Sequence, residues 1–257
     1  MKQSQAKKRD NAMTNKILMG LIALVLGLLF LEILIVHSKN EQQKNASNQV
    51  QTARIMANGD LLYHDGLYMS ALQADGSYDF TENFTYVKPW LKQADLVLGD
   101  FEGTINPDYP LSGYPLFNAP QSVTAAIKDA GYDVMDLAHN HILDSGLEGA
   151  FTTADAFKKV GIDPVGVYEK PVRDNAPLLI KNVNGIKVAI LSYAYGYNGL
   201  ESNLTDKEVA DHLSNLDEKR MKAEIQRAEK EADITEKEGE IETTAGQLQD
   251  AEADRDK

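Results

Sequence analysis

The sequence of 257 residues contains no cysteine, which excludes disulfide bridges and thiolate metal sites. It also has no excess of basic residues: 26 Lys and Arg stand against 39 Asp and Glu, a formal net charge of −13. Such a charge argues against nucleic acid as a partner. Hydrophobic residues make up 43% of the chain, so it can build a real core, either as one large domain or as two small ones.

One long apolar run stands near the N-terminus, at residues 17–36, with Glu32 as its single charged residue. At about 1.5 Å per helical residue it reaches roughly 30 Å, the thickness of a bilayer core. Residues 1–16 hold five basic residues and one acidic residue, and the positive-inside rule places such a tail in the cytoplasm. We therefore expect a single-pass protein of the cell membrane whose domain is extracytoplasmic. A cleaved signal peptide is the alternative, but the exit IVHSKNEQ lacks a small-x-small cleavage site.

Composition divides the rest of the chain into three parts. Residues 37–52 are polar and predict a flexible linker. A folded domain is expected over residues 53–234. Residues 235–257 form an acidic, low-complexity tail that we do not expect to pack.

Strand-like and helix-like segments alternate in the domain, which predicts an α/β fold with a mostly parallel sheet. Strands are expected at 54–58, 95–99, 133–138, 164–167, 177–182 and 186–193, and helices at 83–94, 121–130 and 146–160. Asn184-Gly185 between two strands predicts a type I′ hairpin. Residues 205–234 are charged and helix-prone, and Ser214-x-x-Asp217 predicts a capping box.

Polar clusters follow three of the predicted strands, at the points where the strands end. They are Asp60 with His64, Asp100 with Glu102, and Asn140 with His141 and Asp144. The carboxyl ends of parallel strands meet at one sheet edge, so we expect these side chains to converge. Hard oxygen and imidazole donors of this kind indicate a hydrolytic metal centre. The plainer interpretation is that Asp60 is a turn residue and that Asp100 and Glu102 are solvated loop acids.

A pair of bound cations would lower the pKa of a bridging water and clamp a phosphoryl oxygen. Either His141 or His64 can then protonate a leaving group, and Asn140 can hold a phosphate oxygen. Asp144 either orients a substrate or caps the helix that follows it. His139 is expected to point away from the site and to be structural.

The ordered motifs G-D-x₃-H, ADLVLGDFEG, DLAHNHILDSG and GIKVAILSY resemble the bacterial capsule-synthesis CapA family. These are poly-γ-glutamate biosynthesis proteins related to the calcineurin-like metallophosphoesterases. The resemblance covers roughly residues 54–234. It implies a metallophosphatase-like α/β/β/α sandwich and a role in making or anchoring an anionic surface polymer.

The resemblance also implies a set of metal ligands, namely Asp60, His64, Asp100, Glu102, Asn140 and His141, with His141 and Asp144 serving catalysis. The implied cofactors are divalent metal ions (Mn, Zn, Fe or Mg). Relatives often carry Asn where this chain has Asp100, and they continue with a further strand and a late G-H-x-H pair. Here the last histidine is His212, so we expect an incomplete sandwich with impaired activity and lowered stability.

Three functions remain open from the sequence. The first is an anchored component of capsule synthesis that acts with other polymer-synthesis membrane proteins. The second is a generic extracytoplasmic, metal-dependent phosphoesterase whose substrate is an anionic polymer or a phosphoester. The third is a non-enzymatic, membrane-tethered scaffold for a polymer synthase.

Overall fold

The computed structural model describes residues 31–32, 34–39, 50–171 and 175–233. The chain forms two compact units, residues 1–51 and 52–257. The predicted basic tail, most of the predicted anchor and linker, and the predicted acidic tail lie outside the described residues. Within the described ranges, no helix combines the length and the apolar character needed to cross a membrane.

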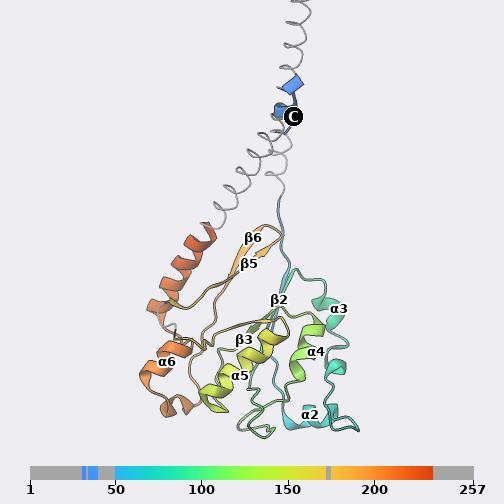
Figure 1. Ribbon diagram of the computed structural model, residues 1–257, viewed down its shortest axis with the longest axis vertical. Coiled ribbons are helices and arrows are strands. Elements are labelled where there is room, and N and C mark those ends of the chain that lie inside the picture. Colours follow the sequence, from blue (N-terminus) through green and yellow to red (C-terminus); the bar gives the residue numbers. More distant parts are fainter. Residues whose placement is uncertain (1–30, 33, 40–49, 172–174, 234–257) are drawn as a thin grey trace, which may run out of the picture. The chain divides into compact units, whose positions relative to one another are not determined.

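Four short strands in the second unit form a parallel sheet with the spatial order β1-β2-β3-β4 (Figure 1). The strands are β1 (Ile55–Asp60), β2 (Leu96–Asp100), β3 (Val134–Asp136) and β4 (Asp163–Val165). Each lies within a residue or two of its predicted position, and the α/β prediction is confirmed. Because all four strands run the same way, their carboxyl ends share one edge of the sheet.

Two helices, α4 (Val123–Ala130) and α5 (Gly146–Lys159), cover one face of this sheet. Their buried side chains recur at helical spacing and share a core with Val97 and Met135 of the sheet. Both helices were predicted. Gly131 ends α4 with φ at 116°, a left-handed conformation that glycine adopts without strain.

The hairpin of β5 (Leu179–Val183) and β6 (Ile186–Ile190) lies on the other face of the sheet. Its turn is the predicted Asn184-Gly185, with both φ angles positive. A second buried cluster joins Val183 of the hairpin to Leu96, Val134 and Val165 of the parallel strands. The parallel sheet is therefore sandwiched between a helical layer and a β layer.

The helix predicted over 83–94 is wrong in extent. The structure has a 3-10 turn, η1 (Thr81–Phe84), and one turn of helix, α3 (Lys88–Leu91). Pro89 lies at the start of α3, and a proline has no N–H to continue a helix from the preceding turn. A further short helix, α2 (Asp65–Ala71), was not predicted.

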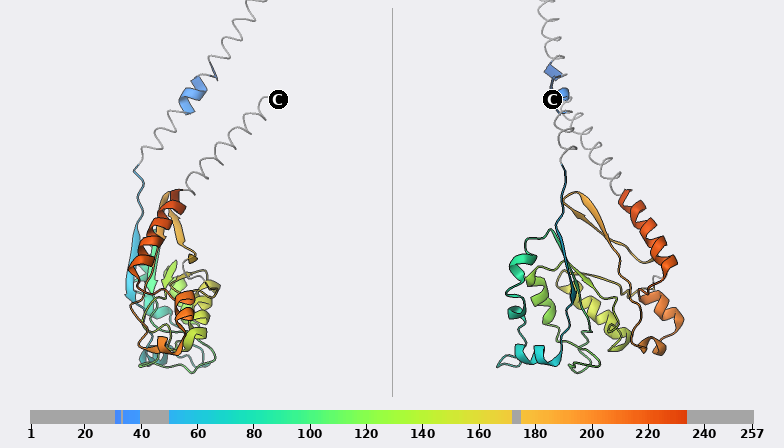
Figure 2. Two further views of the ribbon diagram at one scale, coloured as in Figure 1. Left: turned by 90° about the vertical axis from the view of Figure 1, so that its left-hand side faces the viewer. Right: turned by 180° about the vertical axis from the view of Figure 1, so that it is seen from behind.

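The 3-10 turn η3 (Leu200–Asn203) precedes the charged region, which forms α6 (Asp206–His212) and a helix over 218–233 (Figure 2). The predicted capping box at Ser214 is wrong, because its N–H donates to the Gly166 carbonyl instead. The capping box is formed by Thr205 and Glu208 at α6. Asp217 caps the next helix by accepting the Arg220 N–H at 2.7 Å.

Gly166 offers a direct test of this packing, because its φ is +95° and an added Cβ would lie 2.7 Å from the backbone nitrogen of Ala138. We expect Gly166→Ala to lower the free energy of unfolding by roughly 3 kcal/mol, from backbone strain plus overpacking. Gly161→Ala is the control, since Gly161 has φ +77° with open space around it, and strain alone should cost about 1 kcal/mol. Urea unfolding measures both, and equal losses would contradict the close approach of these two loops.

Candidate functional site

Three aspartates lie side by side where β1, β2 and β3 end. Asp60 is in register with Asp100, and Asp100 is in register with Asp136. A shift in register between Ala57 and Asp60 brings the end of β1 level with the end of β2. Convergence of Asp60 and Asp100 was predicted. Asp136 was missed because it falls inside the segment 133–138, which was treated only as a strand.

The side chains of Asp100 and Asp136 point toward the layer that contains the hairpin. Side chains alternate along a strand, so Asp100 follows Leu96 and Leu98 on the face that the hairpin covers. Asp136 accepts a hydrogen bond from the hydroxyl of Ser192, which lies just after β6. It also accepts the Ala138 N–H at 2.8 Å. The strand ends and the β layer therefore build the site together.

Burial and mutual repulsion dominate the electrostatics of this acidic cluster. Burial, followed by the charges of Asp136, Asp60 and Glu102, raises the pKa of Asp100 to about 7. Burial and the neighbouring carboxyl group of Asp60 raise the pKa of Glu102. The pKa of Asp136 is also raised by burial, against the hydrogen bond from Ser192. Carboxylates held in this way need a proton or a cation between them.

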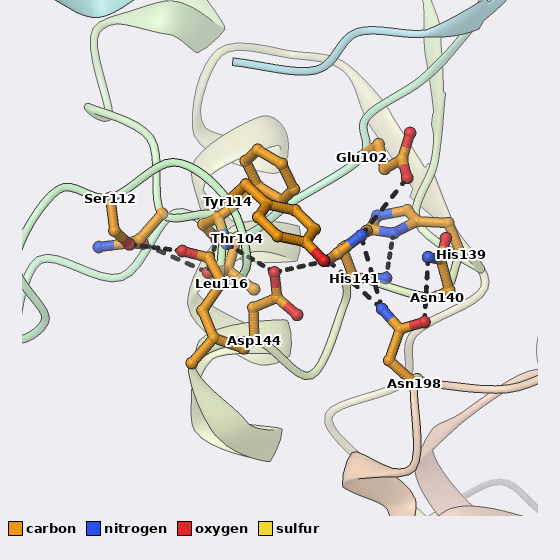
Figure 3. Close-up of polar contacts among 12 residues, drawn as sticks. Glu102, Thr104, Ser112, Tyr114, Leu116, His139, Asn140, His141, Asp144 and Asn198 are labelled. Carbon is orange, nitrogen blue, oxygen red and sulfur yellow. Dashed lines mark hydrogen bonds and ion pairs between the residues drawn. The ribbon is translucent and has the colours of Figure 1, made fainter. Parts of the chain in front are cut away.

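His141 and Asp144 form a hydrogen-bonded pair next to Glu102 (Figure 3). The Nδ1 atom of His141 lies 2.8 Å from Oδ2 of Asp144, and its Nε2 lies 3.8 Å from Oε1 of Glu102. Asp144 also accepts the Phe117 N–H at 2.6 Å. Burial raises the pKa of Asp144, although the Phe117 N–H and His141 counteract the shift. With Nδ1 donating to Asp144, Nε2 is free to take or give a proton on the side of Glu102.

The alternative role of Asp144 as a helix cap is wrong, because Ser145 occupies the N-cap of α5 and makes no side-chain cap. His139 is buried, and its Nδ1 accepts the His141 N–H at 3.1 Å. Burial and the neighbouring His141 lower the pKa of His139 to about 3, so this ring is neutral. A neutral ring that accepts a backbone N–H agrees with its expected structural role.

Asn140 is exposed, and its Nδ2 donates to Oδ1 of Asn198 at 3.2 Å. Asn198 was missed from the sequence, because its partners Asn140 and His141 lie 58 and 57 residues earlier in the chain. Its Nδ2 lies 3.5 Å from both ring nitrogens of His141.

His64 is the N-cap residue of α2. Its ring contacts the neighbouring carboxylate of Asp65 and accepts the Tyr114 N–H at 3.5 Å. Phe117 lies between the two histidines, with ring centroids 5.7 Å from His64 and 4.8 Å from His141. Among the described residues, no hydrogen bond or ion pair joins His64 to Asp60 or Asp100.

The donor chemistry of the cluster fits a hard divalent cation. Oδ1 of Asp100, Oδ1 of Asp144 and Nε2 of His139 are buried atoms without a hydrogen-bond partner in the described structure. Across the ranges that the structure describes, however, no three His, Asp or Glu side chains are grouped closely enough to hold a metal ion. A bound cation would have to draw the carboxylates of Asp60, Asp100 and Glu102 together.

Fold and site define an α/β protein with a carboxylate and imidazole cluster at the carboxyl edge of a parallel sheet. The chain belongs to the family described as "Bacterial capsule synthesis protein PGA_cap", whose model matches residues 54–235. The resemblance to CapA proteins in its motifs is thereby confirmed.

The similarity to individual proteins agrees with this family assignment. The chain is similar to "Capsule biosynthesis protein CapA" of Bacillus anthracis, at 35% identity over 115 residues, 43% of this chain and 28% of the relative. It is similar to "PGA biosynthesis protein CapA" of Bacillus subtilis (strain 168), at 25% identity over 189 residues, 72% of this chain and 48% of the relative. An "Uncharacterized protein y4sH" of Sinorhizobium fredii matches at 28% identity over 160 residues, 59% of this chain and 32% of the relative. The chain thus spans less than half the length of these curated relatives.

The raised pKa of Asp100 predicts how stability depends on pH in the metal-free protein. Between about pH 4 and pH 7 the folded state holds a proton on Asp100 that the unfolded state has released, so stability falls as the pH rises through this window. Asp100→Asn should flatten this slope and stabilise the protein at pH 8. Because the side chain is only partly buried, screening limits the gain to on the order of 1–2 kcal/mol.

Urea unfolding in chelator at pH 5 and pH 8 measures the effect. The control is Asp155→Asn, which removes an exposed carboxylate of α5 and should leave the slope unchanged. A less stable Asp100→Asn protein at pH 8 would contradict the repulsion described here.

Proposed function

We propose that the chain is a membrane-anchored, extracytoplasmic component of capsule synthesis, acting on poly-γ-glutamate through a metallophosphatase-like domain. Family membership supports the capsule role, and the name of the Bacillus subtilis relative supports the polymer. The observation that carries the proposal is the register of Asp60, Asp100 and Asp136 at one sheet edge, beside Glu102 and His141. An acidic cluster of this kind is suited to a cation-dependent reaction on an anionic substrate.

The described layers support the metallophosphatase-like sandwich. Helices α4 and α5 cover one face of the parallel sheet, and the β5–β6 hairpin covers the other. In an α/β/β/α sandwich the hairpin would belong to the second sheet.

The sequence supports the proposed membrane anchor. The apolar run 17–36 after a basic tail favours a single span with the N-terminus in the cytoplasm. The domain would then face the outside, where a surface polymer is assembled, and other membrane proteins of polymer synthesis are its expected partners.

A divalent ion (Mn, Zn, Fe or Mg) would be held by Asp60, Asp100 and Glu102, with Asn140, His141 and His64 completing the predicted set. When bound, such an ion polarises a substrate oxygen and lowers the pKa of a bound water. The chain itself provides the remaining functions. Asp144 orients the His141 ring, and Nε2 of His141 can hold or move a proton on the Glu102 side.

The His141–Asp144 pair also favours a second candidate, a metal-dependent phosphoesterase of broader specificity. A positioned imidazole beside an acidic cluster can protonate the leaving oxygen of many phosphoesters. Hydrolysis of a chromogenic phosphodiester that is abolished by chelator and by Asp60→Ala would favour this candidate over the polymer-specific one.

Replacing the chromosomal gene of the source bacterium with Glu102→Gln tests the capsule role. Glu102 faces Asp60 and His141, so we expect surface polymer to fall at least about 10-fold, as typical for loss of a metal-site side chain. Glu148→Gln is the matched control, because Glu148 is an exposed residue of the first turn of α5. Surface polymer is measured as glutamate released from washed cells. Immunoblots check that the strains contain equal amounts of the protein. Wild-type polymer in the Glu102→Gln strain would refute the proposal.

A further inference from the structure

Asn198 connects the β layer of the domain to the loop that follows β3. It lies eight residues beyond the end of β6, and its side chain reaches both Asn140 and His141 (Figure 3). Neither the motifs in the sequence nor the comparisons with relatives assign it a role. Although Asn198 lies on the loop after β6, these contacts make its side chain part of the site.

The hydrogen bond between the two asparagines fixes the carboxamide of Asn140. Nδ2 of Asn140 donates to Oδ1 of Asn198 at 3.2 Å. A carboxamide whose amino group is engaged in this way offers its oxygen to another partner. The oxygen of an amide is a hard donor that can bind a divalent cation, whereas the amino group of an amide does not bind one. Asn198 therefore selects the orientation in which Asn140 can serve as a ligand.

The other end of the Asn198 side chain holds the His141 ring. Its Nδ2 lies 3.5 Å from Nδ1 and 3.5 Å from Nε2. Equal separations of this length do not fit a hydrogen bond to one lone pair, so the amide contacts the ring as a whole. Asp144 at Nδ1 and the Phe117 ring edge are the other two contacts. Three neighbours thus fix the ring while its Nε2 is left on the Glu102 side.

The backbone of Asn198 is in a left-handed conformation, with φ at 56°. In the described part of the chain, Asn184 in the hairpin turn is the one other non-glycine residue with positive φ. Asparagine tolerates this region better than most residues, but the conformation still carries a cost. Such outliers cluster at functional sites, where the surrounding structure maintains them.

We propose that Asn198 is a positioning residue of the cation site: it sets the carboxamide of Asn140 with its oxygen free and fixes the His141 ring. This inference rests on the proposed function for the identity of the site, while the two contacts themselves are properties of the metal-free chain. A positioning role predicts that loss of the Asn198 side chain weakens cation binding without unfolding the domain.

Asn198→Gly is the sharpest variant, because glycine keeps the left-handed backbone and removes only the side chain. The matched control is Asn184→Gly, which makes the same change at a residue with φ 53° in the hairpin turn. Purified full-length chain in mild detergent is titrated with Mn²⁺, and its melting temperature is recorded without metal. We expect Asn198→Gly to bind Mn²⁺ about 10-fold more weakly, in the range known for residues that orient metal ligands. Its melting temperature should change no more than that of Asn184→Gly, whose Mn²⁺ affinity should equal that of the wild type.

A second measurement separates this inference from the proposed function. In the metal-free chain, the ¹⁵N side-chain amide resonance of Asn140, assigned with Asn140→Asp, should shift in Asn198→Gly and not in Asn184→Gly. If the wild type binds no Mn²⁺, the cation site fails, and the amide resonance alone decides the positioning role. An unchanged resonance, or unchanged Mn²⁺ affinity in Asn198→Gly, would overturn the inference.

Discussion

The register of three parallel strands places the exposed Asp60 next to the half-buried Asp100 and Asp136 at one edge of the sheet, and the rest of the site depends on this arrangement. Carboxylates so close together repel one another, and burial removes the water that would screen them. Burial first, and then the charges of the neighbouring carboxylates, raise the pKa of Asp100, whose Oδ1 has no hydrogen-bond partner in the described structure. A fold that retains such a cluster needs a proton or a cation there, and a cation would make the cluster chemically useful.

The β layer of the domain also provides side chains that contact the site at the edge of the parallel sheet. Ser192 and Asn198 both follow β6; Ser192 contacts Asp136 at the end of β3, and Asn198 contacts Asn140 on the loop after β3. The helix over 218–233 secures this region in turn, because Glu224 accepts the hydroxyl of Tyr193. The geometry of the site therefore depends on the position of the hairpin layer, even though the hairpin strands themselves carry no predicted metal ligand.

Local signals made much of the fold predictable from the sequence. Apolar runs marked the strands, and Asn184-Gly185 marked the hairpin because its two positions need positive φ. The helix predicted over 83–94 is interrupted at Pro89, because a proline has no N–H to bond with the preceding turn, although the apolar residues have helical spacing. For the site, the position of Asp60 and Asp100 followed from strand ends. Asn198 could not be predicted, since its partners are distant in sequence, and the placement of His64 depends on the Tyr114 loop that its ring contacts.

The most direct test is anomalous diffraction from crystals of the protein soaked in Mn²⁺ at pH 8, above the pKa of about 7 of Asp100. We expect an anomalous peak in contact with the carboxylates of Asp60 and Asp100, at about 2.0–2.6 Å as for oxygen ligands of hard cations. A map with no peak at this edge of the sheet, or with Mn²⁺ bound only elsewhere, would contradict it.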